Sequence, residues 1–253
     1  MAHAADAVSG AGGRAPLQSP RTFHLSATGP YFAGLLLLAM VTFWPTYVSL
    51  SPSANSLYTH FHAMVATLWV LLLIAQPMLM RAGRLRAHRA LGKVSWVLAP
   101  VFVIAVVLLA HSRIKGLEGP AYDMQTFILW LQISLACVFA LSYGLAMATR
   151  KSMVHHARFM ICTGLTLIDP VVIRLLLWID RTPDWNYWWL TFGLTDLVLL
   201  ILIWLERNVS RGRGVFPAML VVFVVAQIPA LFQLTGQAWW QGFARWFAAL
   251  PLT

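Results

Sequence analysis

Seven continuous apolar runs, each about 20 residues long, dominate this sequence of 253 residues. They lie at about 30–50, 59–80, 91–111, 124–148, 157–179, 186–205 and 215–235. A helix needs about 20 mainly apolar residues to cross the hydrocarbon core of a bilayer. Because lipid cannot satisfy open backbone groups, such runs predict spanning helices. We therefore expect an all-α integral membrane bundle of seven transmembrane helices.

The composition agrees with a membrane protein. Hydrophobic residues make up 60% of the chain and charged residues 10%, whereas a soluble domain carries about 25% charged residues. This balance excludes a water-soluble enzyme, a nucleic-acid-binding domain and a disordered protein. The two cysteines, Cys137 and Cys162, both fall inside apolar runs, so they predict neither a disulfide framework nor a zinc site.

The net charge of +10 follows from the topology. With a cytoplasmic N-terminus, the segments on the inner side sum to +11 and those on the outer side to zero, while three ionisable residues within spans add −1. Lys and Arg collect in cytoplasmic loops of membrane proteins. We therefore expect a multi-pass membrane protein with the lipid bilayer as its surroundings and no nucleic-acid partner; together with the resemblance described below, this topology implies a bacterial inner (cytoplasmic) membrane.

The two ends of the chain differ from its centre. Residues 1–27 are rich in Ala, Gly, Ser and Pro and predict a flexible cytoplasmic tail before a transmembrane domain at 28–236. In the segment 237–253, apolar side chains recur at helical spacing, with Gln241 and Arg245 off the stripe. The stripe consists of Trp239, Phe243, Trp246, Phe247 and Leu250. It predicts a short amphipathic helix on the outer surface, or one docked onto the bundle or a partner subunit.

Three ionisable residues lie within spans: Asp169, Arg174 and Asp196. Charged groups there are costly and are candidates for function. Asp169 precedes Pro170, which predicts a kink in the fifth span. An ion pair of Arg174 with Asp169 or Asp196 would offset the cost of burial. These residues could form a proton or ion pathway, anchor a polar ligand, or act only as a clamp between helices.

A second polar stripe occupies the second span. His62, Trp69 and Gln76 follow one another at intervals of seven residues and therefore share one helix face. A helix surrounded by lipid has no need for such a face. We expect this face to point to the bundle interior or to a bound group.

Six histidines outside the tail fall into two clusters at opposite ends of the spans. His60, His62 and His111 lie at outer ends, and His88, His155 and His156 lie at inner ends. Neutral imidazole can ligate haem iron or a transition metal, and a transmembrane two-haem electron carrier needs a histidine pair near each face. The metal candidates are His62, His88 and His156. Alternatively, since His88 and His111 are about 35 Å apart along one helix, these histidines are polar helix ends that contact lipid headgroups.

Other chemistries are excluded by missing motifs. No lysine lies in the interior of an apolar run, which excludes a retinal Schiff base, and the histidine spacings do not match those of membrane di-iron desaturases. The sequence also has no Gly-rich phosphate-binding loop.

Several segments resemble an uncharacterised group of bacterial multi-pass membrane proteins over residues 58–200. They are His62-Ala63, Trp69, Gln76-Pro77, His88-Arg89-Ala90-Leu91-Gly92 and His156-Ala157-Arg158-Phe159-Met160. The His-Arg-x-Leu-Gly element is also similar to a broader set of membrane proteins that distantly resembles the two-haem cytochrome b family. That resemblance implies haem b and electron transfer across the membrane. Its ligand candidates are His62 and His111 outside, and His88 with His155 or His156 inside, whereas the ligands of that family lie deeper within the spans.

Three functions are compatible with these observations. The first is a redox protein that binds haem b or a metal and exchanges electrons with quinone, which requires the histidines to converge. The second is an accessory subunit of a larger membrane complex, with partner subunits covering an apolar face. The third is a small proton-coupled transporter that uses Asp169, Arg174 and Asp196.

Overall fold

The computed structural model describes residues 27–179 and 187–253, and within these ranges the chain is helical with no strand. The longer helices are α1 (Gly29–Thr42), α2 (Leu57–Arg81), α3 (Leu85–Ile114), α4 (Gly119–Ala148), α5 (Met153–Leu165), α6 (Ile168–Ile179), α7 (Trp188–Leu205), α8 (Val215–Leu231) and α9 (Ala238–Ala248). Three short helical segments join them: η2 (Trp44–Val48), η3 (Pro52–Ala54) and η4 (Leu234–Gly236). The predicted tail and the outer charges Asp180, Arg181 and Asp184 lie outside the described residues.

Five helical segments are long and apolar enough to cross a membrane, by length and composition: α2, α3, α4, the continuous stretch Met153–Ile179, and α7. The first and last predicted runs form shorter apolar helices, α1 with 14 residues and α8 with 17. In the first run, Pro45 follows the end of α1, and the chain continues as the π-helix η2, because proline supplies no N–H for α-helical bonding. In the last run, Pro229 lies in the final turn of α8.

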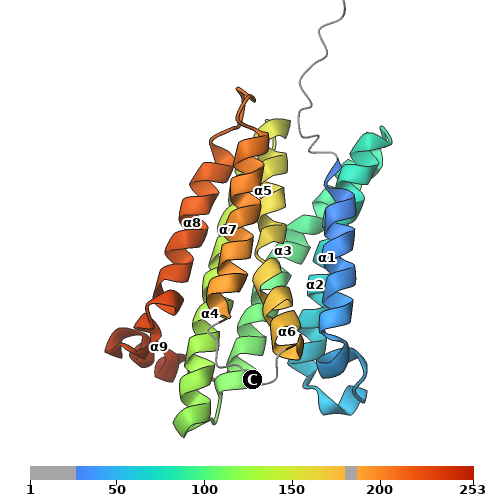
Figure 1. Ribbon diagram of the computed structural model, residues 1–253. Helices are drawn as coiled ribbons and strands as arrows, with labels where there is room; N and C mark the ends of the chain where they lie inside the picture. The colour runs from blue at the N-terminus through green and yellow to red at the C-terminus, as the bar shows by residue number, and fades with distance from the viewer. Residues whose placement is uncertain (1–26, 180–186) are drawn as a thin grey trace, which may run out of the picture.

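The helices form one bundle (Figure 1), with α1 and α2 on one side of it and α8 on the other. Neighbours in sequence pack together, and two further pairs close the bundle: α8 lies against α4, and α6 lies against α1. The connections α2–α3, α4–α5 and α7–α8 lie at the same end of the bundle. The opposite end carries α9 and the C-terminus.

The core is built from large side chains of several helices. Trp69, Phe139, Leu199 and Phe216 are completely buried and belong to α2, α4, α7 and α8. Gly164 of α5 allows α1 and α2 to come close, because a Cβ at this position would overlap the ring of Phe32. This packing fixes the positions of the helices and therefore of the polar side chains that they carry.

The fifth predicted span is interrupted near its middle. Helix α5 ends at Leu165 and α6 begins at Ile168. Pro170 cannot donate a backbone hydrogen bond, and the hydroxyl of Thr166 donates back to the carbonyl oxygen of Thr163 at 2.8 Å. The kink predicted from Asp169-Pro170 is confirmed, and it takes the form of a break of two residues.

Helix α9 docks onto the bundle. Trp240, Ala244 and Phe247 are buried against Ala110, Ile114 and Leu129 of α3 and α4. Trp239 and Trp246, which we had placed on the apolar stripe, are 55% and 58% exposed. The face that docks on the bundle is instead set by Trp240 and its neighbours at positions i+4 and i+7, about 100° further round the helix, so Trp239 and Trp246 are left on the outer side of α9, as expected for a stripe that faces the membrane surface.

Candidate functional site

A cluster of polar side chains links α6, α7 and α8 in the interior of the bundle. Asp169 of α6 is only 4% exposed and accepts a hydrogen bond of 2.5 Å from the hydroxyl of Thr195 on α7. The next residue on α7, Asp196, accepts a hydrogen bond of 3.2 Å from the Nε2 amide of Gln227 on α8. We call these four residues the carboxyl cluster.

The carboxyl cluster contains two acidic groups and no counter-charge. Asp169 is buried and Asp196 is half-buried, on two helices that pack together, and neither forms an ion pair within the described part of the chain. Two carboxylates of the same sign in a low-dielectric interior repel each other and lose their hydration. This arrangement suits the binding of a proton or a small cation between the two groups.

Asp169 lies directly after the break between α5 and α6, and this position affects the electrostatics around its carboxyl group. Asp169 lies in the first turn of α6, where backbone N–H groups lack partners within the helix and the helix dipole is positive. Asp196 is the ninth of the 18 residues of α7 and so lies at mid-helix. The N-terminal end of α6 therefore stabilises the carboxylate form of Asp169.

Arg174 does not pair with either carboxyl group. Its Nη1 donates to the carbonyl oxygen of Pro170 at 2.8 Å, and its guanidinium lies 4.2 Å from the ring centre of Phe43. The expected ion pair with Asp169 or Asp196 is not formed. Five residues of α-helix turn a side chain by about 140°, so Arg174 faces α1 while Asp169 faces α7.

The inner histidines have separate contacts. Nδ1 of His88 is buried with no hydrogen-bond partner among the described residues. Nδ1 of His156 is hydrogen-bonded to the carbonyl oxygen of Ala146 at 2.9 Å. His155 makes a different contact, with the hydroxyl of Ser152 at 2.7 Å. His156 is therefore tied to the end of α4, whereas His155 contacts the residue just before its own helix.

The outer histidines lie in different surroundings. The ring of His62 packs on Phe102, with ring centres 5.8 Å apart. The completely buried His111 packs on Phe247 of α9 and is hydrogen-bonded through Nδ1 to the hydroxyl of Thr253 at 2.6 Å. No described contact joins His62 to His111. His60, the third member of this cluster, is hydrogen-bonded through Nδ1 to Tyr47 at 2.9 Å.

The predicted stripe on α2 faces the bundle interior. Trp69 is completely buried and donates from Nε1 to the hydroxyl of Thr163 on α5 at 3.2 Å. Gln76 donates from Nε2 to the carbonyl oxygen of His88 on α3 at 3.3 Å. With His62 against Phe102, each member of the stripe contacts another helix. These contacts account for Trp69 and Gln76 as groups that fix helix packing.

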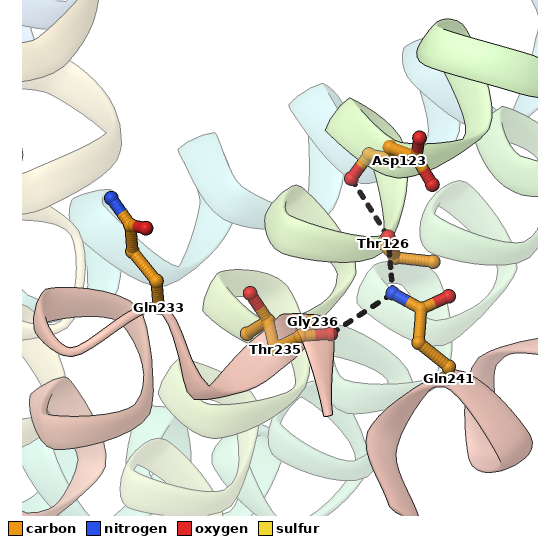
Figure 2. Close-up of a pocket in the computed structure, with 6 residues that line it drawn as sticks. All are labelled: Asp123, Thr126, Gln233, Thr235, Gly236 and Gln241. Atoms are coloured by element: carbon orange, nitrogen blue, oxygen red, sulfur yellow. Dashed lines mark hydrogen bonds between the residues drawn. The ribbon is translucent and has the colours of Figure 1, made fainter. Parts of the chain in front are cut away.

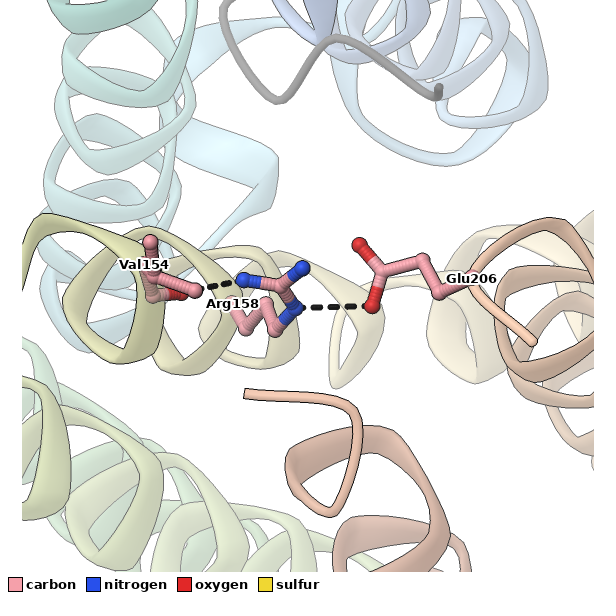
Figure 3. A network of polar contacts seen from close by, with 3 residues as sticks. All are labelled: Val154, Arg158 and Glu206. Atoms are coloured by element: carbon pink, nitrogen blue, oxygen red, sulfur yellow. Dashed lines mark hydrogen bonds and ion pairs between the residues drawn. The ribbon is translucent and has the colours of Figure 1, made fainter. Parts of the chain in front are cut away.

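Sequence reasoning missed a buried ion pair. Nε of Arg158 on α5 donates to Oε2 of Glu206, at the end of α7, at 2.7 Å, and the two side chains are 3% and 2% exposed. Nη1 of Arg158 also donates to the carbonyl oxygen of Val154, as Figure 3 shows. We had counted both residues as loop charges. Both residues lie at the edge of an apolar run, which was a sign that they could be buried. They are 48 positions apart in the sequence, so nothing in the sequence indicated that they pair with each other.

Gly212 allows the α7–α8 connection to pass close to this ion pair. Its φ of +77° is a left-handed conformation that favours glycine. A Cβ there would lie only 2.9 Å from Nη1 of Arg158. The ion pair therefore fastens α5, α7 and the following connection at one end of the bundle.

These contacts can be compared with what a haem or metal site requires. Within residues 27–179 and 187–253 no three His, Cys, Asp or Glu side chains gather as metal ligands do. A haem iron needs only two axial donors; at the inner end, Nδ1 of His88 is buried without a partner among the described residues, and His156 uses its Nδ1 toward Ala146. His62 and His111 keep one unpartnered ring nitrogen each, but they are not brought together as a pair.

Comparison of the chain with protein-family models, curated proteins and solved structures finds no match. The functional argument therefore depends on the geometry above.

Proposed function

We propose that the chain is an integral membrane protein with seven spanning helices and a cytoplasmic N-terminus, in a bacterial inner membrane. Helix α1 together with η2 covers Gly29–Val48, and α8 is about 26 Å long, close to the thickness of a hydrocarbon core. The basic segments after α2, α4 and α7 lie at the same end of the bundle, as the positive-inside rule requires of a cytoplasmic face.

We further propose that the protein binds and moves a proton or a small cation at the carboxyl cluster. The observation that carries this proposal is the buried carboxyl group of Asp169 together with the half-buried Asp196, neither of which has an ion-pair partner among the described residues. Thr195 and Gln227 orient the two carboxyl groups through one hydrogen bond each. A proton or a small cation would neutralise a carboxylate that is otherwise held away from water without a counter-charge.

Proton flux into dye-loaded proteoliposomes tests this function. Asp169→Asn and Asp196→Asn should each lower the flux at least about tenfold, since each removes a group that holds the ion. Glu118→Gln is the matched control, because Glu118 is an exposed acid in the α3–α4 connection. Wild-type flux in Asp196→Asn vesicles would contradict the proposal. If even the wild-type protein gave no flux, with Na⁺ or K⁺ gradients also inactive, an accessory subunit would be the better interpretation.

A second candidate function is supported by His88 and His156. These two residues would hold a haem b or a metal ion near the inner face, and haem supplies one-electron transfer, with quinone as a partner of suitable chemistry. This candidate has one site, at the inner end, because His62 and His111 have different neighbours at the outer end; the two-haem cytochrome b family would require a second histidine pair there.

A reduced-minus-oxidised absorption spectrum of the purified protein, with haem and metal content per chain, tests the second candidate. A b-type signal that is lost in His88→Ala and His156→Ala but kept in His155→Ala would support it. His62→Ala separates the one-site proposal from a two-haem arrangement, because only the latter depends on His62. A colourless, metal-free protein from cells supplied with haem precursor would exclude this candidate.

A further inference from the structure

The two ends of the bundle differ in the charges that they expose. At the end formed by the connections α2–α3, α4–α5 and α7–α8, every exposed charged side chain among the described residues is Lys or Arg. The acid described there, Glu206, is buried against Arg158. The opposite end exposes charges of both signs: Arg113, Lys115, Glu118, Asp123 and Arg245. Asp123 also lines a polar pocket there (Figure 2). A negatively charged partner is therefore favoured at the first end, which we call the basic end.

At the basic end, one face of α3 changes from charged to apolar along the helix. The face consists of exposed residues that recur at helical spacing: Lys93, Trp96, Val97, Pro100 and Ile104. Lys93 lies nearest the basic end. In a helix that crosses a membrane, Lys and Trp side chains of this kind lie at the level of the headgroups, while Val97 and Ile104 contact the acyl chains.

A second cation lies over the same tryptophan. Arg150 follows the end of α4, and its guanidinium carbon lies 5.4 Å from the ring centre of Trp96. Arg150 is exposed and forms no ion pair within the described ranges, so its N–H groups are available to an anion. Trp96 thus has Arg150 over its ring and Lys93 three residues before it on the same helix. We call Lys93, Trp96 and Arg150 the tryptophan site.

Helices α3 and α4 are joined directly beside the tryptophan site. The hydroxyl groups of Ser95 on α3 and Tyr143 on α4 are hydrogen-bonded at 3.0 Å, and Ser95 is the residue before Trp96. This bond fixes the two helices that carry the two cations. The cations are therefore held near each other by the fold, and no acid separates them.

Another arginine–tryptophan contact at the basic end provides a comparison. The guanidinium carbon of Arg207 lies 4.2 Å from the ring centre of Trp204. Nη1 of Arg207 also donates to the carbonyl oxygen of Trp204 at 2.9 Å, and α7 contains no Lys or Arg. This contact is local to one helix end, whereas the tryptophan site combines cations from two elements with a long apolar face.

We propose that the tryptophan site binds an anionic phospholipid of the inner leaflet. Its phosphate lies between Lys93 and Arg150, and an acyl chain lies along Val97 and Ile104. Basic sites at the cytoplasmic ends of spanning helices bind such headgroups. A zwitterionic headgroup would bring its ammonium group to two cations, with no exposed acid described at this end to receive it. The apolar face favours a lipid over free phosphate, because an acyl chain buries apolar surface there. This inference rests on the membrane topology proposed above, and it does not depend on ion movement through the carboxyl cluster.

Native mass spectrometry of the full chain in detergent tests the proposal, with equimolar phosphatidylglycerol and phosphatidylcholine as the probes. The wild type should bind its first phosphatidylglycerol at least about tenfold more tightly than phosphatidylcholine, since two cations contribute. Lys93→Gln and Arg150→Gln should each lower this preference about fivefold, the effect of one Lys or Arg at a membrane surface. Arg207→Gln is the matched control, because it removes an exposed arginine of the same end that also contacts a tryptophan, and it should keep the wild-type preference.

Two further measurements separate the alternatives. Inorganic phosphate should not displace phosphatidylglycerol, and displacement would show that the site binds free phosphate instead. Thermal melts followed by circular dichroism establish that the variants are folded. Equal binding of the two lipids by the wild type, or an equal loss of preference in Arg207→Gln and Arg150→Gln, would overturn the proposal. Reconstitution into nanodiscs tests the membrane topology separately: a protein that enters nanodiscs but shows no lipid preference contradicts the lipid site alone.

Discussion

Two places in this bundle bury acidic groups, and they do so in opposite ways. At the end formed by the α7–α8 connection, Glu206 is buried together with the cation Arg158 at 2.7 Å. The buried Asp169 and the half-buried Asp196 are held by neutral hydrogen-bond donors and have no cation as an ion-pair partner in the described ranges. The first arrangement balances its charges, although Oε1 of Glu206 has no hydrogen-bond partner among the described residues, and it fixes three segments of the chain. The second is incomplete without a proton or a cation, which is why we place function there.

The largest effect should come from breaking the complete arrangement. Glu206→Gln leaves Arg158 as a buried charge without compensation, which should lower the free energy of unfolding by about 3–5 kcal/mol. Unfolding of the detergent-solubilised protein in a denaturant series measures this loss. In the double variant Arg158→Met/Glu206→Met both charges are absent, so most of the stability should return. A stable Glu206→Gln protein would show that the ion pair does not fasten this end.

Substitutions in the carboxyl cluster should affect ion flux much more than the free energy of unfolding. Asp169→Asn keeps an acceptor for Thr195 but removes one of two like charges, so the free energy of unfolding should change by no more than about 1 kcal/mol, while ion flux falls at least about tenfold. The same denaturant series, run beside the flux assay, separates the two quantities. A large loss of stability in Asp169→Asn would identify the cluster as a structural clamp.

The partner of Asp196 should have an intermediate effect. Gln227→Leu removes the donor at 3.2 Å and leaves one carboxyl oxygen of Asp196 without its hydrogen bond, at a cost of about 1–3 kcal/mol. We expect ion flux to be reduced but measurable, because both carboxyl groups remain. Gln227→Glu provides a comparison, since it adds a third acid to the same place and should be less stable than Gln227→Leu.

The smallest effect should come from Arg174. Because its guanidinium contacts Phe43 and Pro170 rather than a carboxylate, Arg174→Gln should cost about 0.5–1 kcal/mol, the usual size of a cation–π contact. Ion flux should stay within about twofold of the wild type. Loss of flux as severe as in Asp169→Asn would mean that Arg174 does compensate the cluster in the working protein.

Features that depend on neighbouring residues could be predicted from the sequence. The long apolar helices follow from composition, and the break between α5 and α6 follows from Pro170, since a missing N–H acts on its own helix. The inward face of His62, Trp69 and Gln76 follows from helical periodicity.

Features that depend on which helices meet could not be predicted in this way. Asp169 and Thr195 are 26 positions apart, and periodicity on one helix does not say which side of another it contacts. The pairing assigned to Arg174 failed for this reason, because proximity along the sequence was taken for proximity in space. The buried face of α9, centred on Trp240, was not predicted either, because an aromatic residue satisfies both a buried and a lipid-facing position.

The break between α5 and α6 divides the molecule mechanically. Helix α5 is fastened to α7 by Arg158 and to the neighbouring helix α4, whereas α6 packs on α1 and α7. A tilt of α6 about the backbone bonds of Thr166 and Leu167 would move the far end of α6 most and Asp169, two residues from the pivot, least. The hydrogen bond between Asp169 and Thr195 therefore lies at the pivot, the point where the two parts of the molecule stay in register.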